Sequence, residues 1–129
     1  MSTLNELIME YVRNINLMDQ MSLDEYDDGE KVRQNNQRAT RNREIARAIE
    51  KRCPELKQEF SALLCSEESS IRGWVAHHML EVMCYDLEHQ LAALAVIRDI
   101  ADTDDTIQGI GNRMWLEQWE RDHPEMMDQ

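Results

Sequence analysis

The adjacent histidines His77 and His78 have the side chains most suited to chemistry, because an imidazole can bind a metal ion or transfer a proton. Glu81 and Cys84 follow within two helical turns, so a carboxylate and a thiol could lie near one ring. Neighbouring helix positions, however, point about 100° apart, so the two histidines cannot face one ion. The HExxH spacing of zinc hydrolases is absent. We expect no metal site, with one histidine packed near the core and the other facing solvent.

The three cysteines, Cys53, Cys65 and Cys84, do not have the CxxC spacing of redox or zinc motifs. Their spacing from the histidines indicates no nucleophile with a base and an orienting third group. An odd number of unpaired cysteines is typical of free, mostly buried thiols in a reducing compartment. Phosphate-binding loops, GxSxG and dinucleotide-binding motifs are also absent. The sequence therefore predicts a cytoplasmic protein without a cofactor that is not an enzyme.

The composition favours a single helical domain. The chain has 129 residues, of which 42% are apolar and 31% charged, and only two prolines and four glycines interrupt it. Leu, Met, Glu, Arg and Ala are plentiful, whereas the residues that favour strands are scarce. No apolar run approaches the roughly 20 residues that span a bilayer, and the first residues lack the features of a signal peptide. We expect no association with membranes.

The net charge of −12 is unevenly distributed. Residues 31–52 contain eight basic and two acidic side chains, so this stretch carries +6 and the rest of the chain −18. A chain this acidic is repelled by nucleic-acid phosphates and attracted to basic partners. The basic stretch itself is typical of a solvated helix face that pairs with acidic neighbours. The charge therefore favours a basic protein partner over nucleic acid.

Apolar residues at three- and four-residue spacing predict six helices and no strand. The predicted ranges are 4–18, 29–52, 54–64, 70–83, 87–101 and 105–122. Pro54 should end the second helix at the residue before it, and Asp86 is placed to cap the fifth. The fourth helix is apolar nearly all round and should be central. The sixth carries an apolar set that should pack inward: Ile107, Ile110, Met114, Trp115 and Trp119.

Two segments of the chain resemble each other at a constant offset of 36 residues: IRGWVAHHMLE at 71–81 and IQGIGNRMWLE at 107–117. Each follows an acidic turn and lies on the second helix of a predicted hairpin. A period in the thirties with paired helices is typical of an α-solenoid unit. The matched glycines, Gly73 and Gly109, suit close helix crossings because a missing side chain lets two backbones approach. We interpret the repeat as structural, with one hairpin stacking on the next.

The first of these segments is similar to the second helix of a HEAT-type repeat, which opens with a branched apolar residue and an arginine. The stretch 54–119 also resembles a family of small bacterial HEAT-like helical proteins of unassigned function. The matching positions are Ile71, Arg72, Trp74, Ala76 and Leu80. The second segment departs from the pattern at Gln108, Gly111 and Asn112. The resemblance implies an all-α fold of about six helices in HEAT-like antiparallel hairpins, stacked as a short α-solenoid.

The expected organisation is one all-α domain, 1–129. It comprises an N-terminal helical hairpin at 1–52, two HEAT-like hairpins at 54–122 and a flexible tail at 123–129. Small acidic helical proteins of this kind recur as immunity partners of bacterial toxins, including those of contact-dependent growth inhibition. The resemblance thus implies an immunity protein that covers the active-site cleft of a basic toxin, such as a nuclease. The alternatives are a helical-repeat scaffold or adaptor with another partner, and a HEAT-like nucleic-acid-binding protein.

Two acidic clusters are the candidate partner-binding residues. Carboxylates at helix N-termini stabilise the helix without any partner, but the excess of acid here is larger than capping requires. Concentrated carboxylates also speed encounter with a basic protein. We therefore expect a monomer that forms a complex with one basic partner through at least one cluster. The candidates are Asp24, Glu25, Asp27, Asp28 and Glu30 before the second helix, and Asp102, Asp104 and Asp105 before the sixth.

Overall fold

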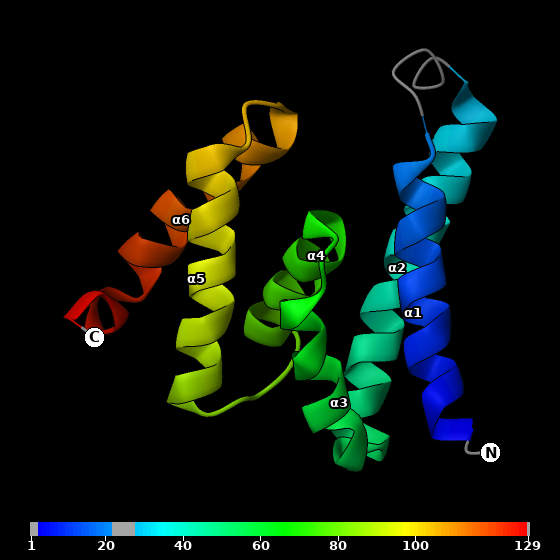
Figure 1. The fold of residues 1–129 in the computed structure, drawn as a ribbon, viewed down its shortest axis with the longest axis horizontal. Helices are drawn as coiled ribbons and strands as arrows, with labels where there is room; N and C mark the ends of the chain where they lie inside the picture. The colour runs from blue at the N-terminus through cyan, green and yellow to red at the C-terminus, as the bar shows by residue number, and fades with distance from the viewer. Residues whose placement is uncertain (1–2, 22–27, 129) are drawn as a thin grey trace.

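The computed structural model describes residues 3–21 and 28–128, and these ranges form six α-helices and no strand (Figure 1). This confirms the predicted all-α fold. The α-helices are α1 (Thr3–Asp19), α2 (Gly29–Arg52), α3 (Lys57–Ala62), α4 (Ser69–Glu81), α5 (Leu87–Thr103) and α6 (Ile107–Asp122). Short 3-10 helices flank α3 and follow α6: η2 (Pro54–Leu56), η3 (Leu63–Cys65) and η4 (Pro124–Asp128).

Local sequence signals set most helix boundaries. The Asp28 side chain caps α2 by accepting hydrogen bonds from the amides of Glu30 and Lys31. This helix ends at Arg52 because Pro54 disfavours helical backbone at Cys53. The Asp86 carboxylate caps α5, accepting from the amide of His89 at 2.9 Å, as predicted. The boundaries thus follow from single residues that act within one turn of chain.

Helix α4 lies at the centre of the fold and contacts α1, α2, α3 and α5 (Figure 1). Its buried residues cover a broad arc of the helix, which agrees with the central position predicted from its apolar character. The α1–α2 hairpin lies on one side of α4 and the α5–α6 hairpin on the other (Figure 1). Stacking of these hairpins as a solenoid stays a prediction. In the described ranges, no helix has both the length and the apolar composition that crossing a bilayer requires.

A buried polar pair fixes the register of the α1–α2 hairpin. The Asn14 amide donates to Oδ1 of Asn42 at 2.9 Å, and the Asn42 amide donates to the carbonyl of Tyr11 at 3.0 Å. Both asparagines are buried, and Asn42 is fully so. In the sequence, Asn42 interrupts a thin apolar stripe of α2. In the fold, Asn42 joins α1 to α2 through these hydrogen bonds. Because a buried amide without a hydrogen-bond partner is costly, only this alignment of the two helices is favourable.

Three sequence-based expectations differ from the structure. The helix expected at 54–64 is divided into η2, α3 and η3, since such short turns tighten into 3-10 geometry. The segment expected to be a tail, 123–129, contains the 3-10 helix η4, and the Met126 side chain is buried, while its flexibility stays a prediction. Two of the expected buried thiols, Cys65 and Cys84, are exposed. Cys65 ends η3 and Cys84 lies in the loop between α4 and α5, where the helical spacing of apolar residues does not specify which side chains are covered.

Candidate functional site

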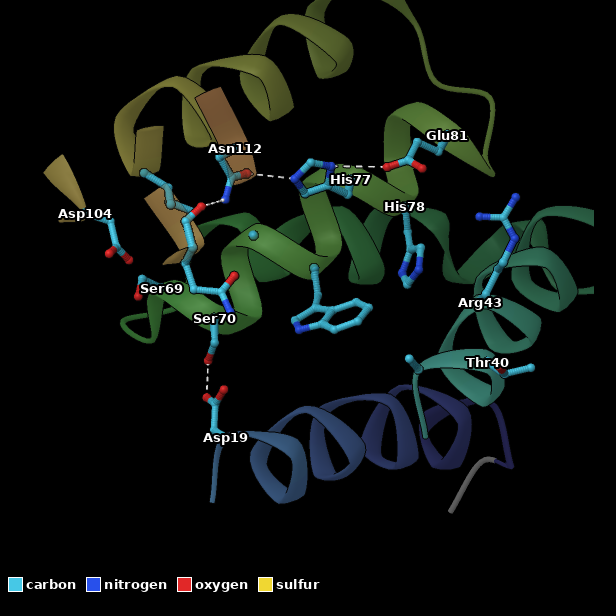
Figure 2. A pocket seen from close by; sticks show the side chains of 15 residues that line it. Asp19, Thr40, Arg43, Ser69, Ser70, His77, His78, Glu81, Asp104 and Asn112 are labelled. Carbon is cyan, nitrogen blue, oxygen red and sulfur yellow. Dashed lines mark hydrogen bonds and ion pairs between the residues drawn. The ribbon is translucent and has the colours of Figure 1, made fainter. Parts of the chain in front are cut away.

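A groove of about 530 Å³ lies between the α1–α2 and α5–α6 hairpins, with α4 as its floor (Figure 2). It exists because α4 separates the two hairpins and contacts both. Most of its lining side chains are polar or charged. The lining residues are Asp19, Ala39, Thr40, Arg43, Ser69, Ser70, Gly73, Trp74, His77, His78, Glu81, Ile100, Asp104, Gln108 and Asn112.

One end of the groove is acidic. Figure 2 shows Asp19 and Asp104 at this end with the α4 serines between them, and Arg43 and Glu81 at the other. The hydroxyl of Ser70 donates to the Asp19 carboxylate. Two exposed carboxylates are close to Asp104 in the chain: Asp102 in the last turn of α5 and Asp105 in the turn that follows. We call the four carboxylates Asp19, Asp102, Asp104 and Asp105 the acidic end.

Local hydrogen bonds hold the Asp104 carboxylate in its ionised form. The hydroxyl and the amide of Thr106 both donate to it, the amide at 2.8 Å. These bonds lower the pKa of Asp104 from its usual value because they favour the charged form. Thr106 in turn caps α6 by accepting from the Gln108 amide. The same turn therefore starts α6 and presents a persistent negative charge to the groove.

The matched glycines have different roles in the structure. A Cβ atom at Gly73 would lie 3.2 Å from the Ile100 side chain of α5, so this glycine does mark a close helix approach. A Cβ atom at Gly109 would lie 1.8 Å from the carbonyl oxygen of Asp104. Gly109 is therefore required by the turn before its own helix. The expectation of a close helix crossing is thus right for Gly73 and wrong for Gly109.

The histidines face different helices, as adjacent positions on α4 require (Figure 2). His78 is buried, and its Nδ1 lies 2.6 Å from the Tyr11 hydroxyl of α1. Burial lowers the pKa of His78 to about 4, because the charged form loses its hydration. His78 therefore packs in the core as predicted for one of the pair.

His77 links α4 to α6. Its Nε2 lies 2.8 Å from Oδ1 of Asn112, and its Nδ1 lies 3.1 Å from the Glu81 carboxylate. The Asn112 amide donates to the carbonyl of Gln108 at 2.7 Å, which fixes Oδ1 toward the histidine. The hydrogen bond with His77 lowers the pKa of Glu81. His77 is half-buried in this network rather than simply facing solvent.

The side chains of this site are suited to binding hydrogen-bond donors. Within the described part of the chain, no three His, Cys, Asp or Glu side chains are placed to hold a metal ion together. The acidic end has carboxylate and hydroxyl oxygens, which accept hydrogen bonds from ammonium and guanidinium groups. A Trp74 ring in the same groove can also contact a cation. The groove is thus suited to basic side chains.

The structure brings together only part of the predicted partner-binding set. Asp24, Glu25 and Asp27 lie outside the described residues. Asp28 caps α2, and Glu30 forms an exposed ion pair with Arg33 at 2.6 Å. In the second cluster, Asp104 lines the groove, and Asp102 and Asp105 are exposed and close to it in the chain.

Sequence reasoning missed two features of this region. Asp19 belongs to the acidic end, but nothing in its local pattern separates it from other helix-terminal acids. The apolar residues Ile107, Ile110 and Met114 of α6 are exposed, whereas their helical spacing predicted inward packing. The spacing identifies an apolar face but does not specify whether another element covers it.

Comparisons with family models, with curated proteins and with solved structures found no match to this chain.

Proposed function

We propose that this protein acts in the cytoplasm by binding a basic protein and covering part of that partner's surface. The observation that carries this proposal is the acidic end, where Asp19 and Asp104 line one end of the groove and the exposed Asp102 and Asp105 are close to Asp104 in the chain. Asp102 is exposed in the last turn of α5, and Asp105 is exposed in the turn that follows, whose conformation is fixed by Asp104, Thr106 and Gly109. A preformed acidic surface attracts a basic partner and costs little ordering on binding.

The charge of this groove supports a protein partner over nucleic acid. Among the described residues that line the groove, Arg43 is the one lysine or arginine, and three acidic side chains accompany it. The basic residues of α2 are partly neutralised, since Arg41 pairs with Glu10 at 2.6 Å and Arg33 pairs with Glu30. A groove that tracks phosphates needs an excess of positive charge, which this groove lacks.

The resemblance to HEAT-like immunity proteins suggests a specific form of this function. The partner is then a toxin domain with a basic substrate-binding cleft, such as a nuclease. Inhibition is steric and electrostatic: carboxylates of the acidic end lie where substrate phosphates would otherwise bind. A scaffold or adaptor protein would bind its partner without blocking an activity. The two forms are distinguished by whether the captured partner loses catalytic activity in the complex.

Charge reversal at the acidic end tests the proposal. The variant Asp102→Lys with Asp105→Lys should associate with the co-purified partner about ten times more slowly at low salt, because electrostatic steering is lost. Both side chains are exposed, so the fold should be unchanged. Asp104 is left intact because it holds the turn.

The matched control is Glu55→Lys with Glu88→Lys, which changes the net charge equally. Both residues are exposed and lie in the first turns of η2 and α5 rather than at the acidic end. This control should associate nearly as fast as the wild-type protein. Equal association rates for the two double variants, measured by stopped-flow or surface-based kinetics, would show that the acidic end does not guide binding.

A further inference from the structure

The outer face of α6 carries an exposed apolar stripe. Ile107 is 77% exposed, Ile110 48% and Met114 65%, and their spacing places them on one side of the helix. The opposite side, which includes Asn112 and Leu116, is buried. Apolar residues that gather on one helix face, rather than being scattered singly, mark a surface that another molecule covers.

The internal repeat shows what kind of element covers such a face. At the offset of 36 residues, Ile107, Gly111 and Met114 correspond to Ile71, Val75 and His78 of α4. Those three residues are 5%, 0% and 6% exposed. Helix α4 contacts both helices of the α1–α2 hairpin, and His78 reaches Tyr11 of α1. Three of the positions that are exposed on α6 are therefore buried on α4, where His78 contacts α1, and the equivalent of Ile110, Trp74, is partly buried.

Gly111 adds an independent indication. A Cβ atom at this position would meet nothing within 4 Å, so no contact inside the described structure requires a glycine. A glycine within a helix costs about 1 kcal/mol relative to alanine. It flanks the face of α6 that carries Ile107, Ile110 and Met114 and adds no side chain there. A glycine on an exposed helix face lets the backbone of a second helix approach closely.

The charge near the stripe and its small area indicate which kind of molecule could cover it. The stripe begins at Ile107, two residues after the exposed Asp105, so basic residues at that end of a docked helix would be close to the negative charge of the acidic end. A second copy is disfavoured because two chains of net charge −12 repel each other. Three apolar side chains also provide much less than the roughly 800 Å² per partner that a stable complex buries. The stripe is sized for a single docked helix.

We propose that the outer face of α6, formed by Ile107, Ile110, Gly111 and Met114, binds an amphipathic helix of the partner. That helix presents an apolar stripe to α6 and basic residues to the acidic end. It occupies the position on α6 that corresponds to the α1–α2 hairpin on α4. This inference rests on the proposed function, because it assumes a basic protein partner.

A synthetic helix provides the probe. The peptide is about 18 residues long, long enough to form a helix, with leucines at helical spacing and lysines on its flanks. Its acidic counterpart has glutamates in place of the lysines. Titration of the full-length, isotope-labelled protein should shift the amide signals of 107–114 and of the α5–α6 turn, and the acidic peptide should bind at least ten times more weakly.

Two variants make the test specific. Ile110→Gln with Met114→Gln changes exposed residues only and should weaken binding of the basic peptide about tenfold or more. Met9→Gln removes an equally exposed methionine of α1 and should leave binding unchanged. The inference is wrong if the Ile110→Gln, Met114→Gln variant binds the basic peptide as tightly as the wild type does. It is also wrong if the amide shifts lie outside 107–114 and the α5–α6 turn, or if sedimentation shows that the stripe forms a dimer. If native-partner binding is slowed by reversal at the acidic end but not by the stripe variant, the proposed function stands and only the stripe assignment fails.

Discussion

Replacement of Gly109 by alanine is expected to lower the free energy of unfolding by about 3 kcal/mol, as for a severe overpacking change. The added methyl group would lie 1.8 Å from the carbonyl oxygen of Asp104 and 2.8 Å from its carbonyl carbon. Both are backbone atoms, so the turn itself must move, and the Thr106 cap depends on that turn. Urea unfolding followed by circular dichroism measures the loss.

Gly111→Ala is the matched control, because it makes the same substitution two residues later in the same helix. Its Cβ atom would meet nothing within 4 Å. Alanine is the better helix former, so this variant should be more stable than the wild type by about 0.5–1 kcal/mol. If the two variants have the same stability, the described contact between Gly109 and the α5–α6 turn is wrong.

Acidification from pH 6.5 to about pH 4 is expected to remove on the order of 3 kcal/mol of stability through His78 alone. In the folded protein, burial lowers the pKa of this histidine from 6.5 to about 4. Between these values the unfolded chain binds a proton that the folded chain does not, so stability falls as pH falls. Above pH 6.5 the contribution is fully present. Unfolding curves at several pH values within this window measure the effect.

His78→Gln separates this histidine from the other groups that titrate. Glu81, Arg43 and His77 all influence His78 electrostatically, and they remain in the variant. The variant should be less stable at pH 7, because it changes a buried residue, but its stability should fall much less between pH 6.5 and 4. An unchanged pH dependence in the variant would show that His78 is not buried in its neutral form.

The parts of the fold that depend on local chemistry could be predicted from the sequence. Asp86 caps α5 and Pro54 ends α2 because each acts within one turn of chain. Helix α4 is central because apolar residues occur on nearly all of its sides. The adjacent histidines contact different helices because neighbouring positions on a helix point in different directions. The buried Asn42 could not be predicted, since its partner Asn14 lies on another helix.

The candidate site was only partly predictable for the same reason. An excess of acid identified Asp102, Asp104 and Asp105, but the addition of Asp19 depends on how α1 packs against α4. The stripe on α6 was expected to be buried because its spacing is that of a core-facing helix. Its exposure follows from the position of α6 at the edge of the fold, where no described element covers its outer face.

The most direct test of the central claim is the salt dependence of association between the wild-type protein and a stoichiometric partner co-purified from its native host. The account predicts a basic partner whose association rate constant falls at least tenfold between about 20 mM and about 500 mM salt, because screening removes electrostatic steering. Dissociation should change much less. An acidic partner, or an association rate that is the same at every salt concentration, would contradict the account.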